Sequence, residues 1–345
     1  MKVGILTHQQ HINYGGILQC FALSTYLKLL GHEPLVIRRV PNKSNIIKRI
    51  LRSFLKQLGL KRFNQVLPDR AANVRSFVDE NLNRTAVIDS HSLMNKVCSQ
   101  YQLEAVLVGS DQVWRRDFAI NYGFDYFLDF VPSNVIKASY AASFGLNTWD
   151  YTNDESKIIK RLLQEFRGIS VREKEAVELC KNHLGIDAEL LIDPTMLLDD
   201  TIYGKYSSER IIQDKYVFVY WLGDTSDISK EIIEYESLGY KVKLITLRGN
   251  HVVDSIEDWL SYIKFADVIL TDSFHGCVFS MLFHKQFVAY CNQSGGYGRI
   301  KSLFQNMGIS DKLEKPKMSV DYALVDRHME ALRVKATNYL NEVLQ

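Results

Sequence analysis

Residues 268–276 read VILTDSFHG, a short run of strand-forming apolar residues that passes directly into polar ones. This pattern is typical of a buried strand that ends where a helix begins, with Ser273 placed to cap the helix. His275 would lie near the helix amino terminus, where free N–H groups and partial positive charge favour an anion. A histidine there can give a proton or a hydrogen bond to a phosphate. The alternative is a capped helix with a structural histidine.

The same alternation of short apolar runs and amphipathic stretches extends outward from this segment and occurs twice along the chain. It predicts repeated βαβ units and parallel sheets with helices on both faces. We therefore expect an α/β fold of two Rossmann-like, doubly wound domains that face a cleft, with ligands beyond the carboxyl ends of the strands. The expected divisions are a first domain at 1–200, a second at 201–317, and a C-terminal helix at 318–345 that packs back on the first domain.

Strands are expected at 2–7, 34–38, 105–108, 138–142, 169–171 and 190–192 in the first half, and at 216–220, 242–246, 268–271 and 287–290 in the second. The clearest helices are expected at 16–30, 228–238, 256–265, 276–283, 299–307 and 320–343.

The totals exclude several classes of protein. The 345 residues carry 42 Lys and Arg against 40 Asp and Glu, so the overall charge does not favour a nucleic-acid partner. The five cysteines are scattered without a Cys-x-x-Cys pair, which favours neither a disulfide framework nor a zinc site. We expect reduced thiols, no metal and no cofactor. Reduced thiols are the default in a cytosol, so we expect a cytoplasmic protein. No apolar run is long enough for a segment to be expected to span a bilayer.

Polar turns after the other expected strands supply further candidate site residues. Asp111 follows the strand at 105–108 and could act as a base toward a hydroxyl, or could cap the next turn. Arg172 follows the strand at 169–171, where it could face an anionic ligand or pair with Glu173. Ser143 lies in the polar turn after the strand at 138–142.

The segment from Ser273 through Ser310 contains no acidic residue but includes His275, His284, Lys285, Arg299 and Lys301. This half of the cleft is therefore expected to be electropositive. Within it, residues 294–299 read SGGYGR, in which glycines allow a close approach of backbone amides and Arg299 can clamp a phosphate or carboxylate.

Asn13, Tyr14 and Gly15 open the turn after the first expected strand, where dinucleotide domains bind phosphate. The full Gly-x-Gly-x-x-Gly pattern does not occur, so we assign no nicotinamide or flavin. The glycines permit a tight turn, with Asn13 and Tyr14 expected to face the cleft.

The basic segment 38–62 carries nine Lys and Arg residues and no acid, with apolar residues at helical spacing between them. Such a helix suits an anionic membrane surface or the headgroup of a lipid-linked substrate. The alternative is a core-facing helix with a solvated basic face.

Six motifs, taken in order, resemble the polysaccharide pyruvyl transferase family: NYGGILQ at 13–19, GSDQVW at 109–114, SYAASFG at 139–145, SVRE at 170–173, DPT at 193–195 and TDSFHG at 271–276. The resemblance covers most of the chain, from Lys2 to about Gly308. It implies a fold similar to the GT-B glycosyltransferases, with the acceptor on the first domain and the donor anion on the second.

The resemblance also implies phosphoenolpyruvate as donor, a sugar as acceptor and a cyclic ketal as product, with release of phosphate, in the biosynthesis of a surface exopolysaccharide. This chemistry requires a proton at the enol methylene, stabilisation of the adjacent cationic carbon and a base for the hydroxyl. We assign His275 as general acid or phosphate partner and Asp111 as base. Arg172 and Arg299 are assigned as anion clamps, and Ser273, Asn13, Tyr14, Gly15 and Ser143 as further substrate-binding residues.

The chain departs from the family pattern at one place, since Ser273-Phe274-His275 stands where better-studied members resemble Arg-Leu-His. The role of that arginine would pass to Arg299 or Lys285, or the donor would differ. Two other functions remain open: a nucleotide-sugar glycosyltransferase of GT-B type, and a catalytically silent glycan-binding partner. The acceptor could be lipid-linked, with the basic segment 38–62 in peripheral contact with the inner face of the membrane.

Overall fold

The computed structural model describes residues 1–41, 69–290, 297–313, 315 and 317–345. Its first sheet has four parallel strands in the order β2-β1-β3-β4. The strands are β1 (Lys2–Leu6), β2 (Glu33–Val36), β3 (Ala105–Val108) and β4 (Ile136–Ser139). Single bridges from Ala138 to Gly168 and from Ala142 to Val171 extend the sheet toward the short parallel pair β5 (Ser170–Val171) and β6 (Glu189–Leu190).

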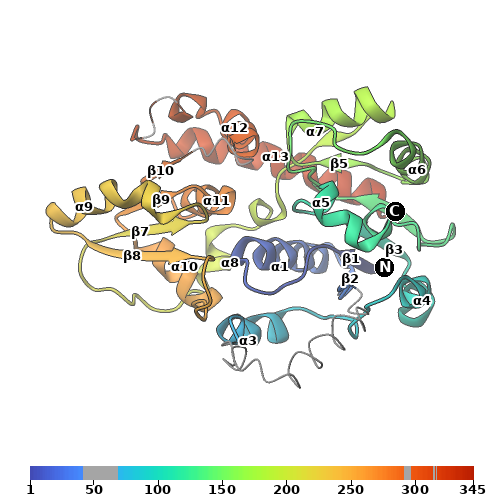
Figure 1. Cartoon of the computed structure of the whole chain (residues 1–345), viewed down its shortest axis with the longest axis horizontal. Coiled ribbons are helices and arrows are strands. Elements are labelled where there is room, and N and C mark those ends of the chain that lie inside the picture. Colours follow the sequence, from blue (N-terminus) through green and yellow to red (C-terminus); the bar gives the residue numbers. More distant parts are fainter. Residues whose placement is uncertain (42–68, 291–296, 314, 316) are drawn as a thin grey trace, which may run out of the picture.

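The second sheet is also parallel, in the order β10-β9-β7-β8. Its strands are β7 (Tyr216–Trp221), β8 (Lys241–Thr246), β9 (Val268–Thr271) and β10 (Phe287–Ala289). When strands are numbered within each lobe, both sheets have the order 2-1-3-4. The expected pair of Rossmann-like lobes is therefore confirmed, and Figure 1 shows them side by side.

Helices connect and cover the strands. Those of the first lobe are α1 (Tyr14–Leu29), α3 (Ala72–Asn81), α4 (His91–Tyr101), α5 (Arg116–Ala119), α6 (Asn153–Leu163) and α7 (Lys174–Leu179). Helix α8 (Asp200–Gly204) lies at the predicted domain limit. The later helices are α9 (Ser229–Ser237), α10 (Ile256–Phe265), α11 (Phe274–Leu282), α12 (Tyr297–Asn306) and α13 (Tyr322–Val343).

Helix α1 lies in the middle of the molecule, between the lobes (Figure 1). Twelve of its 16 residues are buried, because it is apolar nearly all round and therefore needs packing partners on several sides. Its first residue, Tyr14, stacks on Trp259 of α10 with ring centroids 5.2 Å apart. One continuous apolar core joins α1 to α10 and α11, so the lobes share a packed boundary.

Helix α13, red in Figure 1, contacts both lobes. Near its start Tyr322 donates a hydrogen bond to the carbonyl of Lys285 in the second lobe. Near its end Tyr339 donates to the carbonyl of Ser139 at 2.7 Å, in the first lobe. The domain limits at 200 and 317 remain predictions.

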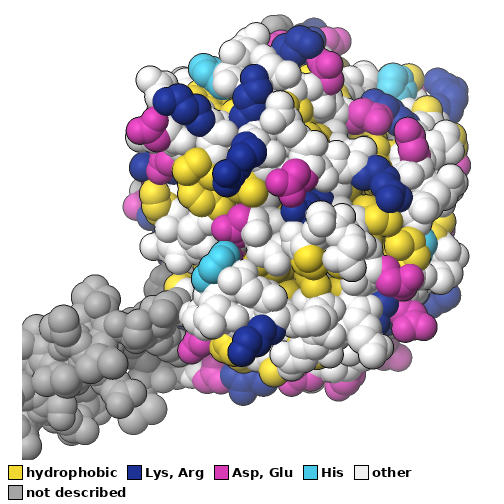
Figure 2. Space-filling view, turned by 90° about the vertical axis from the view of Figure 1, so that its right-hand side faces the viewer, with side chains coloured by type: hydrophobic (Ala, Val, Ile, Leu, Met, Phe, Trp, Pro, Cys, Tyr) yellow, Lys and Arg dark blue, Asp and Glu magenta, His cyan; other side chains and the backbone are white. Residues whose placement is uncertain are grey.

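The molecular surface in Figure 2 mixes basic and acidic side chains over the end of the first lobe. Residues 42–62 of the basic segment lie outside the described residues. Within the described part of the chain, every helix is too short or too polar to cross a bilayer.

Most strand expectations agree with the structure to within two residues, and β3 and β9 agree at both ends. The largest difference is β4, which ends at Ser139 rather than Ala142. The ladder is interrupted at Ala141, whose φ of 48° lies in the left-handed region, and beyond it continues only as single bridges from Ala142 to Asp111 and Val171. The predicted polar turn after this strand therefore starts earlier.

Candidate active site

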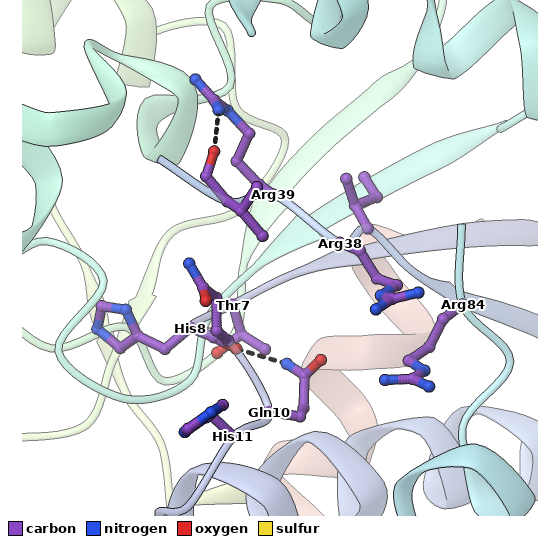
Figure 3. Close-up of a pocket in the computed structure, with 10 residues that line it drawn as sticks. Thr7, His8, Gln10, His11, Arg38, Arg39 and Arg84 are labelled. Atoms are coloured by element: carbon purple, nitrogen blue, oxygen red, sulfur yellow. Dashed lines mark hydrogen bonds between the residues drawn. The ribbon is translucent and has the colours of Figure 1, made fainter. Parts of the chain in front are cut away.

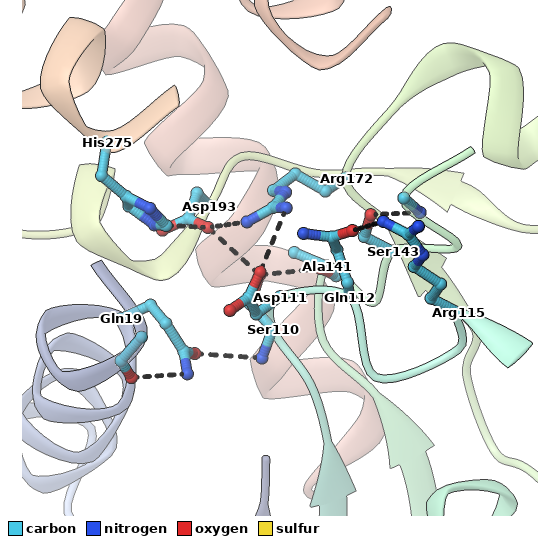
Figure 4. Close-up of polar contacts among 12 residues, drawn as sticks. Gln19, Ser110, Asp111, Gln112, Arg115, Ala141, Ser143, Arg172, Asp193 and His275 are labelled. Carbon is cyan, nitrogen blue, oxygen red and sulfur yellow. Dashed lines mark hydrogen bonds and ion pairs between the residues drawn. The ribbon is translucent and has the colours of Figure 1, made fainter. Parts of the chain in front are cut away.

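Two groups of polar side chains lie at the carboxyl ends of the strands. One lines a pocket of about 140 Å³ in the first lobe, shown in Figure 3, whose described lining contains no predicted site residue. The other lies between the lobes and is shown in Figure 4. It contains His275, Arg172 and Asp111, so the structure brings these three predicted residues together.

His275 is held between the lobes. It occupies the first turn of α11 and is 7% exposed. Its Nε2 lies 3.6 Å from Oδ2 of Asp193, a residue of the first lobe. On its other side a Cβ atom added to Gly15 would lie 2.0 Å from Nδ1, so only glycine leaves room for the imidazole.

Asp193 is the centre of the cluster. It caps a short 3-10 helix at Pro194–Met196, and its Oδ1 accepts hydrogen bonds from the backbone N and the hydroxyl of Thr195 at 3.0 and 2.7 Å. Its Oδ2 accepts from Arg172 at 2.6 Å and from the Ser110 hydroxyl at 3.2 Å. Burial alone would raise the pKa of Asp193, but His275 and Arg172 outweigh it, so the pKa is well below its usual range.

Arg172 is surrounded by acids. Besides Asp193, its Nε donates to Glu173 at 3.1 Å, and its Nη2 lies 3.7 Å from Asp111. Its guanidinium lies 4.5 Å from the ring centroid of Phe274. Burial disfavours its charge, but Glu173, Asp193 and Asp111 more than compensate and raise the pKa of Arg172. Arg172 therefore pairs with Glu173, which is one of the two sequence alternatives, and also with two acids that are distant in the sequence.

Asp111 is 8% exposed and follows β3 in a left-handed conformation, with φ 71°. Burial raises its pKa, but Arg172, His8, His275 and Arg299 together lower it. Asp111 also lies near the positive end of α1, since a Cβ added to Gly16 would lie 3.8 Å from its Oδ2. Asp111 is therefore a carboxylate that can orient a hydroxyl, and a weaker proton acceptor than an unperturbed carboxyl.

Tyr14 is placed differently from expectation. Its side chain is fully buried, and its hydroxyl donates to the carbonyl of Asp254 at 3.0 Å, so it joins the lobes and is not open to a ligand. The reason is the large apolar area of the ring, which is better buried against Trp259 than left facing solvent. Gly15, next to Tyr14, lies against the His275 ring.

Three predicted residues make structural hydrogen bonds within the protein. Asn13 is exposed and caps α1 through a hydrogen bond from the backbone N of Gly16. Ser273 caps α11, again by accepting from the N of Gly276, as the sequence alternative proposed. Ser143 is fully buried and donates to Glu173 at 2.8 Å, so it supports the acid that holds Arg172.

Arg299 lies in the first turns of α12, close enough to Arg172, Glu173 and Asp111 to sense their charges. Burial and then Arg172 lower its pKa. Lys285, the other substitute for the missing arginine, follows the C-terminal end of α11, whereas His275 lies in its first turn. The charged groups that act on Lys285 are Asp267 and Arg210, and neither belongs to the cluster.

The half of the cleft formed by residues 273–310 is less electropositive than expected, because acids from the first lobe lie against it. That segment contains no acid, but Asp193, Asp111 and Glu173 of the first lobe lie against it. A local count of charge could not reveal this because the acids come from strand ends far away in the sequence.

Sequence reasoning gave no role to Asp193, Gln19 or Arg115. Asp193 opens the DPT motif directly after the strand expected at 190–192, and this position is the sequence signal for a role in the site. Gln19 accepts from the backbone N of Ser110 at 3.2 Å and so ties α1 to the turn that carries Asp111. Arg115 donates a hydrogen bond to Gln112 at 3.1 Å, and its charge helps to lower the pKa of Arg299. Arg115 is therefore a second cation on the Arg299 side of the cluster.

Together, two parallel α/β lobes and a buried polar cluster at their shared boundary define a two-lobed protein of the kind that binds ligands between Rossmann-like domains. The family model described as polysaccharide pyruvyl transferase matches residues 13–294. The chain therefore belongs to the polysaccharide pyruvyl transferase family and is a transferase, and the acceptor class of the family is a sugar or polysaccharide.

Solved structures with similar folds cover nearly the whole chain at low identity. A UDP-GlcNAc 2-epimerase from Methanocaldococcus jannaschii is 14% identical over 96% of this chain and 92% of that chain, with a TM-score of 0.46. A glycosyltransferase from Rickettsia africae is 12% identical over 99% of this chain and 96% of that chain, with a TM-score of 0.45. No curated protein matches the sequence significantly.

Proposed function

We propose that the chain transfers the pyruvyl unit of phosphoenolpyruvate to two hydroxyls of one sugar residue, forming a cyclic ketal and releasing phosphate. Besides the family match, one observation carries this proposal. His275 of the second lobe meets Asp193 of the first, with Asp111 and Arg299 beside them. A donor bound by one lobe and an acceptor bound by the other would meet at this boundary.

The reaction needs two C–O bonds to form at the same carbon. A proton is added to the terminal methylene of the enol, and the adjacent carbon becomes electrophilic. The first sugar hydroxyl attacks that carbon and gives up its proton. The second hydroxyl then attacks the same carbon and displaces phosphate. Of the two protons released by the hydroxyls, one makes up for the proton added to the methylene and the other leaves with phosphate.

His275 is the group proposed to handle the proton. Nε2 lies 3.6 Å from Oδ2 of Asp193, too far for a hydrogen bond, and has no hydrogen-bond partner among the described residues, whereas Nδ1 lies against Gly15. Nε2 is therefore the nitrogen proposed to carry the proton. Asp193 is then a positioning residue that acts on the ring through its charge.

We assign binding of the phosphoenolpyruvate anion to Arg299 and Arg115. Arg172 is less suited than the sequence suggested, because its guanidinium already faces three carboxylates. We therefore propose that Arg172 holds Asp111, Glu173 and Asp193 in place. Phosphoenolpyruvate carries a carboxylate and a phosphate, and two arginines can bind them with charge-assisted hydrogen bonds.

Asp111 is proposed to accept a hydrogen bond from the attacking hydroxyl. Because its pKa is lowered, Asp111 is better suited to orient the hydroxyl than to accept its proton, so its effect is on the placement of the nucleophile.

As the biological setting we propose surface exopolysaccharide biosynthesis on the cytoplasmic side of the membrane, with a lipid-linked acceptor and peripheral membrane contact through segment 38–62.

The test incubates the protein with phosphoenolpyruvate and a panel of simple and lipid-linked glycosides. Phosphate release and a pyruvylated product, detected by mass, are the expected results. His275→Ala should abolish both. His284→Ala is the matched control, because His284 is an exposed histidine just beyond the other end of α11, paired with Asp326. Near-normal turnover by His275→Ala would remove His275 from the mechanism.

The nucleotide-sugar alternative is separated by thermal stabilisation. Stabilisation by phosphoenolpyruvate and not by nucleotide sugars supports pyruvyl transfer, and the reverse supports glycosyl transfer. A silent glycan-binding protein would bind the glycoside panel but would release no phosphate with any member of it.

A further inference from the structure

The pocket in Figure 3 lies in the first lobe, beyond the carboxyl ends of β1 and β2. Its wall is formed by residues that directly follow these strands, from Thr7 to His11 and from Ile37 to Val40, together with Arg84. Its volume of about 140 Å³ is well below the range of about 300–1,000 Å³ for sites of drug-sized ligands. The pocket is therefore suited to one small group rather than to a whole ligand.

The charge of the wall is one-sided. The ten described lining residues include three arginines and two histidines but no acid. Arg39 is neutralised, since its Nε donates to Asp125 at 2.5 Å. Arg38 pairs with no carboxylate among the described residues, and Arg84 pairs only with Asp79, whose side chain is 53% exposed.

The guanidinium groups of Arg38 and Arg84 lie near one another in Figure 3, close enough for the charge of Arg38 to act on Arg84. Two cations placed together repel each other, and burial followed by Arg38 lowers the pKa of Arg84. An anion between them would remove this repulsion and could accept from both planar forks. The geometry therefore has an unmet preference for a bound anion.

Two imidazoles complete the wall. His11 lies beside Gln10 in Figure 3, on the side of Gln10 away from Arg84. Among the described residues, Nε2 of His8 is buried and has no hydrogen-bond partner. His8 also lies close enough to Asp111 to contribute to its lowered pKa, so the pocket wall adjoins the candidate active site.

We propose that this pocket binds a phosphate group of the sugar acceptor, held by Arg38 and Arg84, and so places the acceptor hydroxyls near Asp111. The inference rests on the proposed function for the identity of the second substrate, but the pocket is separate from the groups assigned to phosphoenolpyruvate. The phosphate could belong to a sugar phosphate or to a lipid-linked sugar. Both present the same chemistry to the two arginines.

The test compares pairs of ligands that differ only in charge: methyl glycosides and the 1-phosphates of glucose, galactose and mannose. Calorimetry on the full chain should give affinities for at least one 1-phosphate that are about tenfold or more above those of its methyl glycoside, as expected for charge-assisted bonds. A polyprenyl phosphate in detergent micelles, compared with micelles alone, separates the lipid source from the soluble one.

Arg38→Gln and Arg84→Gln should each remove this preference while leaving phosphoenolpyruvate affinity unchanged. Arg248→Gln, which changes an arginine 61% exposed on the second lobe, is the matched control. Circular dichroism melting confirms folding, and Arg38→Lys, which keeps the charge, should retain part of the preference.

An equal affinity for neutral and phosphorylated ligands would overturn the inference, as would undiminished phosphate binding by both glutamine variants. Failure of the proposed function gives a different result: no binding or turnover of phosphoenolpyruvate by the wild-type chain, whatever the sugar phosphates do. The two failures are therefore distinguishable in the same set of proteins.

Discussion

The imidazole of His275 lies against the α-carbon of Gly15, so that a Cβ atom at position 15 would come within 2.0 Å of Nδ1 and 2.3 Å of Cγ. The two residues belong to different lobes, α1 in the first and α11 in the second. One glycine thus determines how closely the lobes approach at the residue assigned to proton transfer.

Gly15→Ala should displace the imidazole or separate the lobes. Because misplacement by about 1 Å can cost on the order of a hundredfold in rate, pyruvyl transfer should fall by about that factor while the protein still folds. Steady-state phosphate release measures this. Gly204→Ala is the control, since its added Cβ would meet only Lys264 Nζ, at 3.5 Å. Full activity of Gly15→Ala would show that His275 does not need this position.

Asp193→Asn should destabilise the fold strongly. The change leaves Arg172 without its shortest carboxylate contact in a buried site, and breaking such a pair typically costs about 3–5 kcal/mol. Urea unfolding measures the loss, and it should exceed the loss caused by Asp187→Asn, whose exposed carboxylate pairs with Lys181. Similar losses in the two variants would mean that the cluster contributes little to stability.

Acid should reduce the contribution of Asp193. Its pKa in the folded protein is lowered, so its stabilisation is fully present above the unfolded pKa of about 3.9 and is lost as the pH falls toward the folded value. The difference in unfolding free energy between wild type and Asp193→Asn should therefore be constant above about pH 5 and shrink below about pH 4. A difference that grows with acid would contradict the assigned direction.

Tyr14→Phe tests whether Tyr14 has the structural role seen at the lobe boundary rather than a substrate-binding role. Loss of the hydrogen bond to Asp254 should lower the free energy of unfolding by about 1 kcal/mol, while KM for phosphoenolpyruvate and for the acceptor stays the same. Thermal melting and steady-state kinetics give the two numbers. A tenfold rise in either KM would restore the substrate-binding role expected from the sequence.

Substitutions of Arg172 and Arg299 by lysine should affect different properties, the stability of the fold in the first case and phosphoenolpyruvate binding in the second. Arg172→Lys loses the planar fork shared by Asp193 and Glu173, so its main result should be a lower melting temperature. Arg299→Lys keeps the charge but loses bidentate binding, and KM for phosphoenolpyruvate should rise about tenfold. If Arg172→Lys instead raised KM with unchanged stability, Arg172 would be the anion clamp first expected.

Much of the fold was accessible from the sequence. Alternating apolar runs located β3 and β9 at both ends, because buried parallel strands are short and continuously apolar. The polar turns after β3, β5 and β9 correctly pointed to residues that meet in space, since the carboxyl ends of parallel strands gather at the same edge. The cap formed by Ser273 followed from local chemistry alone.

Tertiary structure decided which of these residues are neighbours and which partners they use. The sequence marked His275, Asp111 and Arg172 as polar residues at strand ends, and local patterns carry that information. It could not show that Asp193 would stand 3.6 Å from His275, or that three acids would surround Arg172. Those contacts depend on how the two lobes pack against each other through α1, where Tyr14 and Gly15 lie at the boundary. The burial of apolar surface between the lobes is a property of the whole fold, so no single segment of the sequence could reveal it.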